Sequence, residues 1–273
     1  MKFKIGFSAE TNNQNEETVI SNDDNRHLST VAPRRSVVEI FFPDRNITCS
    51  YYNDLFDLKK GNLVYVDGKL EGLKGRVVNI SYTFKIKLSD YKRVIGVADT
   101  QVVGELHQAG SHLVTFDRNA LNYSKVITWF KAPQDEEEIL VGDDGEPFNI
   151  RDLGQMKVSE GVANRGHEYY IDNRVAYIEL DKGKGRAIVL GSVPYEVEFK
   201  YDNGQISGLV CGCYCTGNCK HGFATMLQLR ETLDIIAENH PDADLNGFVA
   251  IVSKSAFFEF AFEGKGTGTL TLR

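Results

Sequence analysis

The sequence of 273 residues predicts an α+β fold that is predominantly β, with an N-terminal small β-barrel and a C-terminal β-meander, hairpin and helix. Three observations lead to this prediction. Short runs of β-branched and aromatic residues recur between Gly, Asn and Asp turns, which is typical of strands in small barrels. One stretch near the C-terminus has the three-and-four apolar spacing of an amphipathic helix. Between the last hairpin and that helix lies a dense group of cysteines.

Length and charge divide the chain into regions. A chain of 273 residues suggests two domains, at roughly 100–200 residues each. Residues 1–33 carry 3 Lys+Arg and 5 Asp+Glu, residues 34–131 carry 15 and 10, and residues 132–273 carry 13 and 23. The charge is therefore −2, +5 and −10 in turn, which sums to the net −7 of the chain. A basic middle region precedes an acidic C-terminal half.

The N-terminal region, residues 1–33, predicts one strand and a polar loop. Lys2–Ser8 alternates cationic and apolar residues, and we expect it to add a strand to the basic region that follows. Thr11–Ser29 is rich in Asn, Asp and Glu, a composition typical of a polar loop.

The basic region, residues 34–131, predicts a small β-barrel-like domain. Four strand-like runs follow one another, at Val37–Phe42, Asn62–Val66, Gly75–Ile80 and Tyr82–Leu88. The stretch Leu58–Val78 contains a Gly-x-x-Val-x-Val entry at residues 61–66, followed by Gly72, Gly75 and Val77. Over these roughly twenty residues the chain resembles a KOW-type barrel element. The glycines also have a purely structural interpretation, since tight barrels need them at turns.

The same region predicts a surface for nucleic acid. Cations that meet phosphates, interleaved with aromatic rings that stack on bases, are typical of single-strand binding surfaces. The alternative is an ordinary solvated strand face. The candidate contact residues are Lys69, Lys74, Arg76, Lys85, Lys87, Lys92 and Arg93, spread among Tyr65, Tyr82, Phe84 and Tyr91.

Residues 132–147 predict an acidic linker or exposed loop. Carboxylates run through Ala132–Glu138, and Val141–Pro147 adds glycines, a proline and further carboxylates. We assign this segment no binding role.

The C-terminal region, residues 148–273, begins with a predicted meander. Val162–Gly166 and Tyr169–Val175 predict a strand-turn-strand, with the turn at Asp172-Asn173. Asp181–Arg186 predicts a hairpin tip, because no helix follows its glycines and cations, and Ala187–Leu190 predicts a buried strand.

A hairpin and a helix follow. Tyr195–Tyr201 alternates apolar and charged residues, Asp202-Asn203-Gly204 is a strong hairpin signal, and Ile206–Val210 predicts the returning strand. The residues from Gly222 to Glu238 have helical periodicity, and the proline that follows His240 ends the helix.

The cysteine group between hairpin and helix predicts a zinc site. Five candidate ligands lie within eleven residues, namely Cys211, Cys213, Cys215, Cys219 and His221. Thiolate and imidazole are preferred zinc ligands, and a structural site takes four of them. In extended chain, residues two apart share a face, and the Thr-Gly-Asn turn can bring the last two ligands back to the ion. A disulfide between residues two apart would close a strained ring.

Two registers are compatible with this spacing. The ligands are either Cys211, Cys213, Cys219 and His221, or Cys213, Cys215, Cys219 and His221. The first has the longer connection, which gives the chain more room to reverse around the ion.

The segment Tyr195–Leu229 resembles a SWIM-type zinc finger, whose core is Cys-x-Cys, a variable spacer and Cys-x-His. The entering strand at 191–199, the second strand at 206–210 and Lys220 between the last two ligands match it, and the strand-turn-strand upstream is similar to what precedes such fingers. The resemblance implies the register that begins at Cys211, with Cys215 as a spacer residue. It also implies binding to DNA or to other proteins, within assemblies that include helicase-like ATPases.

Nothing in the sequence predicts catalysis, so we expect a protein that is not an enzyme. There is no phosphate-binding Gly-x-x-x-x-Gly-Lys-Ser/Thr loop and no Gly-x-Ser-x-Gly elbow. We expect His107 and His112 in loops, His167 at the edge of the meander and His240 on the surface. No apolar run approaches the roughly 20 residues of a membrane span, and a cytoplasmic protein with reduced thiols is expected.

Two classes of function follow. The first is a non-enzymatic zinc-binding accessory protein that binds nucleic acid, DNA in preference to RNA, with a helicase-like ATPase as a further partner. The second is a protein–protein interaction adaptor in a larger assembly of that kind. The acidic C-terminal half favours the second, because acidic surfaces repel phosphates.

Overall fold

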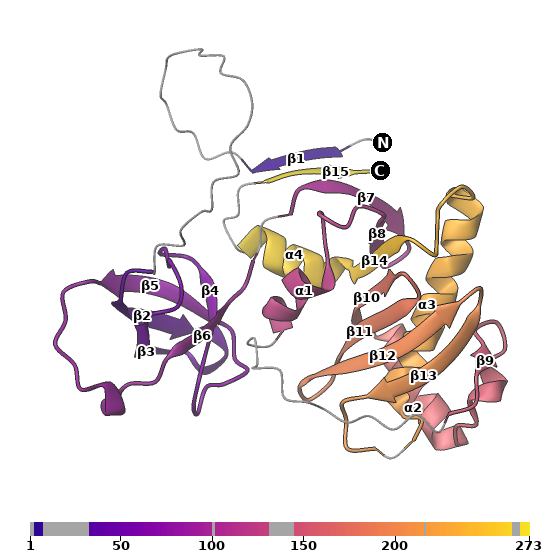
Figure 1. Cartoon of the computed structure of the whole chain (residues 1–273), viewed down its shortest axis with the longest axis horizontal. Coiled ribbons are helices and arrows are strands. Elements are labelled where there is room, and N and C mark those ends of the chain that lie inside the picture. Colours follow the sequence, from indigo (N-terminus) through magenta and orange to yellow (C-terminus); the bar gives the residue numbers. More distant parts are fainter. Residues whose placement is uncertain (1–2, 8–32, 100–101, 131–144, 216, 264–267) are drawn as a thin grey trace, which may run out of the picture.

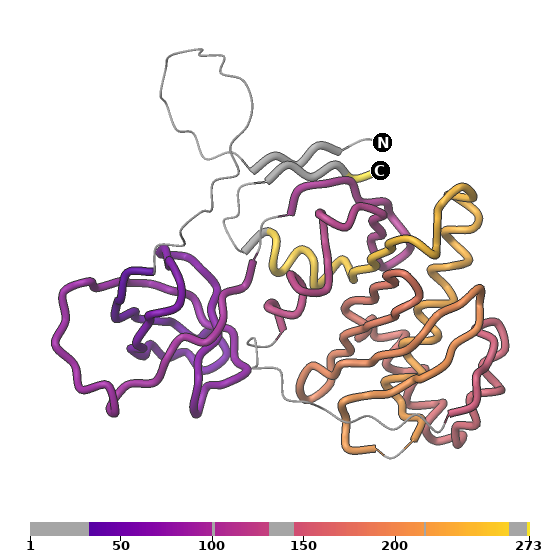
Figure 2. Tube along the Cα trace, viewed as in Figure 1, coloured from indigo at the N-terminus to yellow at the C-terminus, as the bar shows by residue number. Residues whose placement is uncertain are grey.

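The computed structural model of the chain describes residues 3–7, 33–99, 102–130, 145–215, 217–263 and 268–273. These residues form one sheet of five strands and one of ten, together with helices, so the predicted α+β, predominantly β class is confirmed (Figure 1). Figure 2 shows that the chain passes through all strands of the small sheet before it reaches the central strands of the large sheet. The predicted polar loop at residues 11–29 and most of the predicted linker at 132–147 lie outside the described residues.

The small sheet buries one face of its strand Ser36–Phe42. Val38, Ile40 and Phe42 are fully buried on one face of their strand. Its strand order is β3-β2-β5-β4-β6, and the strands are β2 (Ser36–Phe42), β3 (Ile47–Asn53), β4 (Leu63–Val66), β5 (Gly75–Ser81) and β6 (Val94–Val97).

The predicted barrel is an open sheet whose edges meet at one point. Tyr52 of β3 and Arg93 next to β6 form a single bridge, in which the Tyr52 N–H donates to the carbonyl of Lys92 at 2.9 Å. The predicted strand Tyr82–Leu88 is wrong, because only a 3₁₀ turn at Leu88–Asp90 is regular there. Since β5 already pairs with β2 and β4, the chain that leaves it finds no free edge beside β5.

The large sheet gathers strands from both ends of the chain. Its order is β1-β15-β7-β8-β14-β10-β11-β12-β13-β9, and every neighbouring pair is antiparallel except β15 and β7. The strands are β1 (Phe3–Phe7), β7 (Gly104–Ala109), β8 (His112–Thr115), β9 (Phe148–Asn149), β10 (Val175–Asp181), β11 (Lys184–Leu190), β12 (Pro194–Asp202), β13 (Gln205–Cys211), β14 (Phe248–Ser253) and β15 (Gly268–Leu272).

The two sheets divide the chain differently from the predicted regions. The N-terminal strand pairs with the C-terminal strand β15 instead of joining the basic sheet, because β15 leaves one edge open beside its parallel contact with β7. Strands β7 and β8, which fall within residues 34–131, also belong to the large sheet. Residues 34–98 hold 12 Lys+Arg and 7 Asp+Glu, whereas residues 99–131 hold 3 of each. The whole excess of positive charge therefore belongs to the small sheet.

The predicted hairpins are confirmed. Asn203 and Gly204 connect β12 to β13 with φ values of 45° and 88°, as an Asn-Gly turn requires. Lys182 and Gly183 form the tip between β10 and β11, with φ values of 51° and 78°. The strands expected at 187–190, 195–201 and 206–210 lie within β11, β12 and β13.

A helix replaces the predicted strand-turn-strand at residues 162–175. The helix α2 (Glu160–Ile171) begins after Ser159, whose hydroxyl accepts from the Val162 N–H at 3.4 Å. It packs on α3 (Lys220–Asn239), the helix that the sequence predicts. At Gly166 an added Cβ would lie 2.8 Å from a ring carbon of Phe223 and 3.0 Å from the Lys220 carbonyl oxygen, so the two helices approach closely there.

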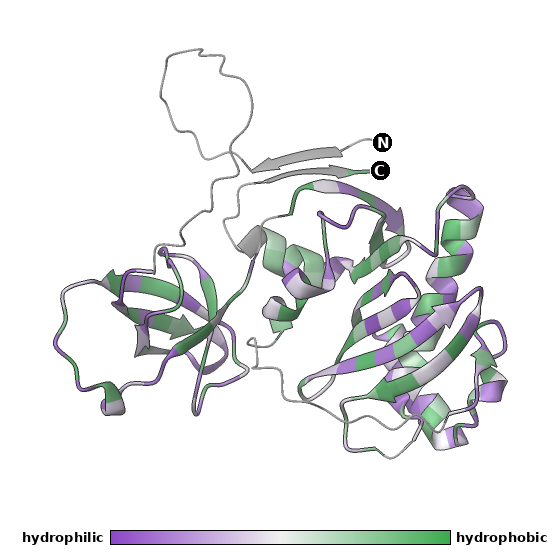
Figure 3. Cartoon of the chain, in the orientation of Figure 1, coloured by the Kyte–Doolittle hydropathy of each residue, from purple (hydrophilic) through white to green (hydrophobic). Residues whose placement is uncertain are grey.

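The central strands β8, β10 and β14 of the large sheet are buried on both faces. The helices α1 (Tyr123–Phe130) and α4 (Lys254–Glu263) cover one face with Trp129, Phe257 and Phe260, while α3 covers the other. Apolar residues gather on α4 and on the central strands in Figure 3. Leu63 and Tyr65 of the small sheet belong to the same hydrophobic core as Trp129, Phe257 and Phe260, so side chains of the two sheets pack in one core. No helix in the described part of the chain is long and apolar enough to span a membrane.

Candidate metal centre

The predicted ligands come from the end of one strand and the start of one helix. Cys211 is the last residue of β13, where it pairs with Val197 of β12. Cys219 is the N-cap of α3, and its Sγ accepts from the Gly222 N–H at 3.5 Å. His221 follows in the first turn of the helix. The end of the hairpin and the start of the helix thus both supply ligands to the same small volume.

The ligand atoms converge. One atom each from Cys211, Cys213, Cys219 and His221 lies within 4.8 Å of every other. The Nδ1 atom of His221 is 3.6 Å from Cys211 Sγ and 3.9 Å from Cys219 Sγ. Cys219 and His221 are buried, and the other two residues are half-buried. A group of this kind could hold a metal ion.

The thiols of the cluster influence one another's ionisation. A hydrogen bond from the Cys211 thiol, with further contributions from His221 and the Gly222 N–H, lowers the pKa of Cys219. The same thiol–thiol contact, together with burial, raises the pKa of Cys211, and burial raises that of Cys213. Three thiolates in one small volume repel one another, and a cation among them removes this cost.

Aromatic side chains orient the histidine. The ring of Tyr195 stacks on that of His221, with centroids 4.2 Å apart and planes 18° apart, and the Tyr169 ring lies at 5.3 Å. The Nε2 atom of His221 is buried without a hydrogen-bond partner among the described residues. Ring stacking therefore fixes the plane of the imidazole, and its Nδ1 lies toward the sulfurs of Cys211 and Cys219.

The remaining cysteines lie apart from the cluster. Cys215 is exposed and does not belong to the group of converging ligand atoms, although it stands only two residues after Cys213. Cys49 lies in β3 of the small sheet. The structure thus brings together the four ligands of the register that begins at Cys211, and not those of the register that includes Cys215.

The residues predicted to contact nucleic acid do not converge in the same way. Four are exposed, namely Lys69, Lys85, Lys87 and Lys92. Three others have partners within the protein: Lys74 forms an ion pair with Glu259, Arg76 donates to the Gly61 carbonyl at 3.4 Å, and Arg93 pairs with Asp54 at 3.2 Å.

Two of the four aromatic residues expected beside these cations are unavailable for stacking. Tyr65 is 1% exposed, and the ring of Phe84 packs edge-on against Tyr52 at 6.1 Å. Tyr82 is 40% exposed, with the Arg34 guanidinium 4.2 Å above its ring. Of the expected stacking residues, Tyr82 is therefore the one that presents a ring to solvent, since Tyr91 is half-buried.

The histidines outside the cluster depart from their expected positions. His107 and His112 lie in β7 and β8 and not in loops, and His112 is fully buried. His167 is an exposed residue of helix α2, and His240 is half-buried against His107, with ring centroids 4.5 Å apart. His107 and His240 are far apart in the sequence, so no local spacing could have predicted their contact.

None of the family models, curated proteins or solved structures compared with the chain matches it.

Proposed function

We propose that this chain is a non-enzymatic zinc-binding protein in which a closed Cys₃His site, of the SWIM type, fastens the β12–β13 hairpin to helix α3. The observation that carries this proposal is the convergence of three sulfur atoms and one imidazole nitrogen within 4.8 Å. The order of hairpin, Cys-x-Cys, Cys-x-His and helix supports the resemblance to that family.

The spacing suits zinc. Metal–sulfur distances of about 2.3 Å and metal–nitrogen distances of about 2.0–2.1 Å place sulfur and nitrogen about 3.6 Å apart at the corners of a tetrahedron. The two sulfur–nitrogen distances here are 3.6 and 3.9 Å. Four protein ligands fill a tetrahedron and leave no position for a reactive water, which favours a structural role over a catalytic one.

The second part of the proposal is that the protein is an accessory factor that binds nucleic acid, DNA in preference to RNA, through the small sheet. Its support is the positive charge of residues 34–98 together with the exposed lysines Lys69, Lys85, Lys87 and Lys92. An added Cβ on Gly68 would lie 3.2 Å from Lys92 Cε, so the Lys92 side chain lies against the backbone of the residue that precedes Lys69. Neighbouring cations can contact successive phosphates.

A protein–protein interaction adaptor, in an assembly with a helicase-like ATPase, is the second candidate. Two observations favour it. Two of the four rings expected to stack on bases, Tyr65 and Phe84, are buried or packed against another ring, and the region that carries the cysteine cluster has 13 Lys+Arg against 23 Asp+Glu.

The salt dependence of binding separates the two candidates. Fluorescence anisotropy with labelled single-stranded and duplex DNA should show binding that weakens as salt rises, with a slope of about 0.7–0.9 per phosphate contact. The double variant Lys85→Ala/Lys87→Ala should reduce both the affinity and the slope. Lys182→Ala/Lys184→Ala, an equal charge change on an exposed hairpin of the large sheet, should leave both unchanged.

Either of two results would favour the adaptor: no binding at low salt, or equal losses in the two double variants. The zinc proposal has its own test, metal content, so the failure of one part leaves the other standing.

A further inference from the structure

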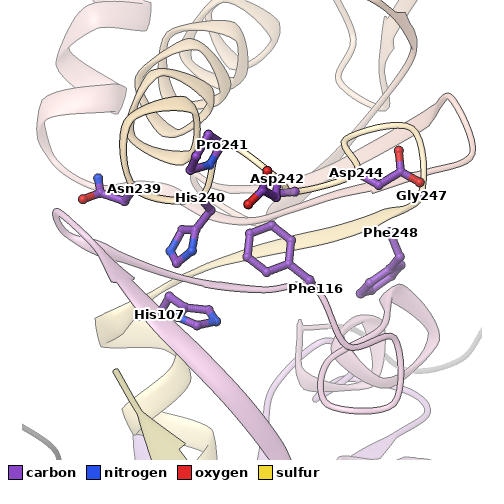
Figure 4. A pocket seen from close by; sticks show the side chains of 10 residues that line it. His107, Phe116, Asn239, His240, Pro241, Asp242, Asp244, Gly247 and Phe248 are labelled. Carbon is purple, nitrogen blue, oxygen red and sulfur yellow. The ribbon is translucent and has the colours of Figure 1, made fainter.

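A pocket lies at the end of α3 that is opposite to the cysteine cluster (Figure 4). It has a volume of about 580 Å³. Its walls come from β7, the residue after β8, the loop that follows α3 and the start of β14. None of the features discussed above uses this pocket.

Three rings meet on one side of the pocket. The centroids of His107 and His240 are 4.5 Å apart at 61°, and the Phe116 ring lies 5.7 Å from the first and 5.4 Å from the second. In Figure 4 the imidazoles of His107 and His240 lie next to each other beside the Phe116 ring, while the side chain of Asn239 points away. Phe248 and Pro241 add apolar surface. The pocket can therefore enclose an apolar body beside the faces and edges of aromatic rings.

The polar groups of the pocket favour positive charge. Asp242 and Asp244 are exposed lining residues, and Asp244 is held in place by the Asn246 N–H, which donates to its Oδ1 at 3.0 Å. The C-terminal end of α3 adds the partial negative charge of a helix terminus. Two nearby cations have partners of their own: Arg118 forms an ion pair with Asp181 and lies 5.0 Å above the Phe248 ring, and Arg273 pairs with Glu105 at 2.5 Å.

The imidazole of His107 adds an acceptor rather than charge. Burial, and then the neighbouring His240, lowers the pKa of His107, so its ring is neutral at pH 7. A neutral imidazole offers one ring nitrogen as a hydrogen-bond acceptor. A metal ion fits less well, because the cysteine cluster is the one group of three or more metal-binding side chains that converges in the described part of the chain.

We propose that this pocket binds a small organic cation, a primary ammonium group carried on an apolar or aromatic body. The ammonium group would donate to a neutral imidazole and to Asp242, and it would lie against the ring of Phe116, where cation–π attraction contributes. The apolar body would occupy the surface formed by Phe248 and Pro241.

Three probes of nearly equal size test the charge requirement. Isothermal titration calorimetry of the full zinc-loaded chain at pH 7.5 would use phenethylammonium, the neutral 2-phenylethanol and the anionic 3-phenylpropionate. We expect one saturable site for the ammonium compound and about tenfold weaker binding of the other two, a difference of about 1.4 kcal/mol, because they lack the ion pair and the cation–π contact. Equal affinity for all three probes, or no saturable binding of the ammonium compound, would overturn the proposal.

Two conservative variants locate the site. Asp242→Asn should weaken ammonium binding severalfold by removing one charge, and Phe116→Leu should weaken it by removing the ring while keeping an apolar side chain. Asp202→Asn, the same charge change at an exposed residue next to the β12–β13 turn, should leave the affinity unchanged. Melting curves establish that each variant is folded. If Asp242→Asn and Asp202→Asn have equal effects, the cation does not bind in this pocket.

Discussion

The cysteine cluster and the basic surface were both predicted from residue types, yet only the residues of the cysteine cluster converge in the structure. Four metal-ligand residues from a strand end and a helix start converge within 4.8 Å. The seven cations expected to share one surface are divided between four exposed lysines and three residues with partners inside the protein. The end of β13 and the start of α3 bring four ligands from a short sequence span to one place, whereas no such element gathers cations that are spread over some twenty-five residues of an open sheet.

The largest effect is expected from removing a ligand that also caps a helix. Cys219→Ser should lose the metal and unfold the region around α3, because structural zinc contributes on the order of 10–16 kcal/mol of apparent binding free energy coupled to folding. Circular dichroism melting with and without a chelator measures this. The wild-type protein in chelator should resemble the variant; a wild type that melts identically with and without chelator would show that the cluster has no metal to lose.

A smaller effect is expected where α2 meets the start of α3. In Gly166→Ala the new Cβ would crowd the ring of Phe223 and the Lys220 carbonyl, so we expect a loss of about 1–3 kcal/mol of unfolding free energy, as for other overpacked sites. Gly161→Ala is the matched control in the same helix, because the nearest atom to its Cβ would be Arg165 Nη1 at 3.6 Å. It should be neutral or slightly stabilising. Urea denaturation compares the two, and equal losses would contradict the close packing of the helices.

Acid should destabilise the large sheet through His112. Burial lowers its pKa below the ordinary 6.5, and its Nε2 lies 2.8 Å from the Val175 carbonyl oxygen. The neutral ring is thus favoured in the folded state. Its contribution to the free energy of unfolding is complete above pH 6.5 and declines as the pH falls below that value. Urea midpoints at pH 7.5 and 5.5 measure the decline, and His112→Gln should reduce it. Metal release also favours unfolding in acid and affects both proteins. The effect of His112 is therefore the difference between the wild type and His112→Gln in how far the urea midpoint falls from pH 7.5 to 5.5.

The smallest effect concerns Lys74, which the sequence assigns to the nucleic-acid surface and the structure assigns to the contact between the sheets. Its Nζ pairs with Glu259 and lies 4.1 Å above the Phe260 ring. Lys74→Met should cost about 1 kcal/mol of unfolding free energy and leave DNA affinity less affected than Lys85→Ala/Lys87→Ala. A loss of DNA affinity equal to that of the double variant would show that Lys74 contacts DNA, as the sequence predicts.

The elements that local chemistry controls could be predicted from the sequence. The Asn203-Gly204 turn, the alternating strand before it and helix α3 all have short-range signals, and so do the four converging ligands. The helix α2 was missed because the residues on either side of the Asp172-Asn173 turn are rich in strand-forming types, and the cap at Ser159 was the signal that could have identified it. The pairing of β1 with β15, the contact of Lys74 with α4 and the meeting of His107 with His240 depend on residues far apart in the chain. No local pattern encodes these contacts, so they required the structure.

The central claim is that one zinc ion is held by the register that begins at Cys211. Elemental analysis of purified protein should give about one zinc per wild-type chain and per Cys215→Ser chain, and much less in Cys211→Ser, because only Cys211 belongs to the converging group of four. Loss of zinc in Cys215→Ser with retention in Cys211→Ser would contradict the account and assign the site to the other register.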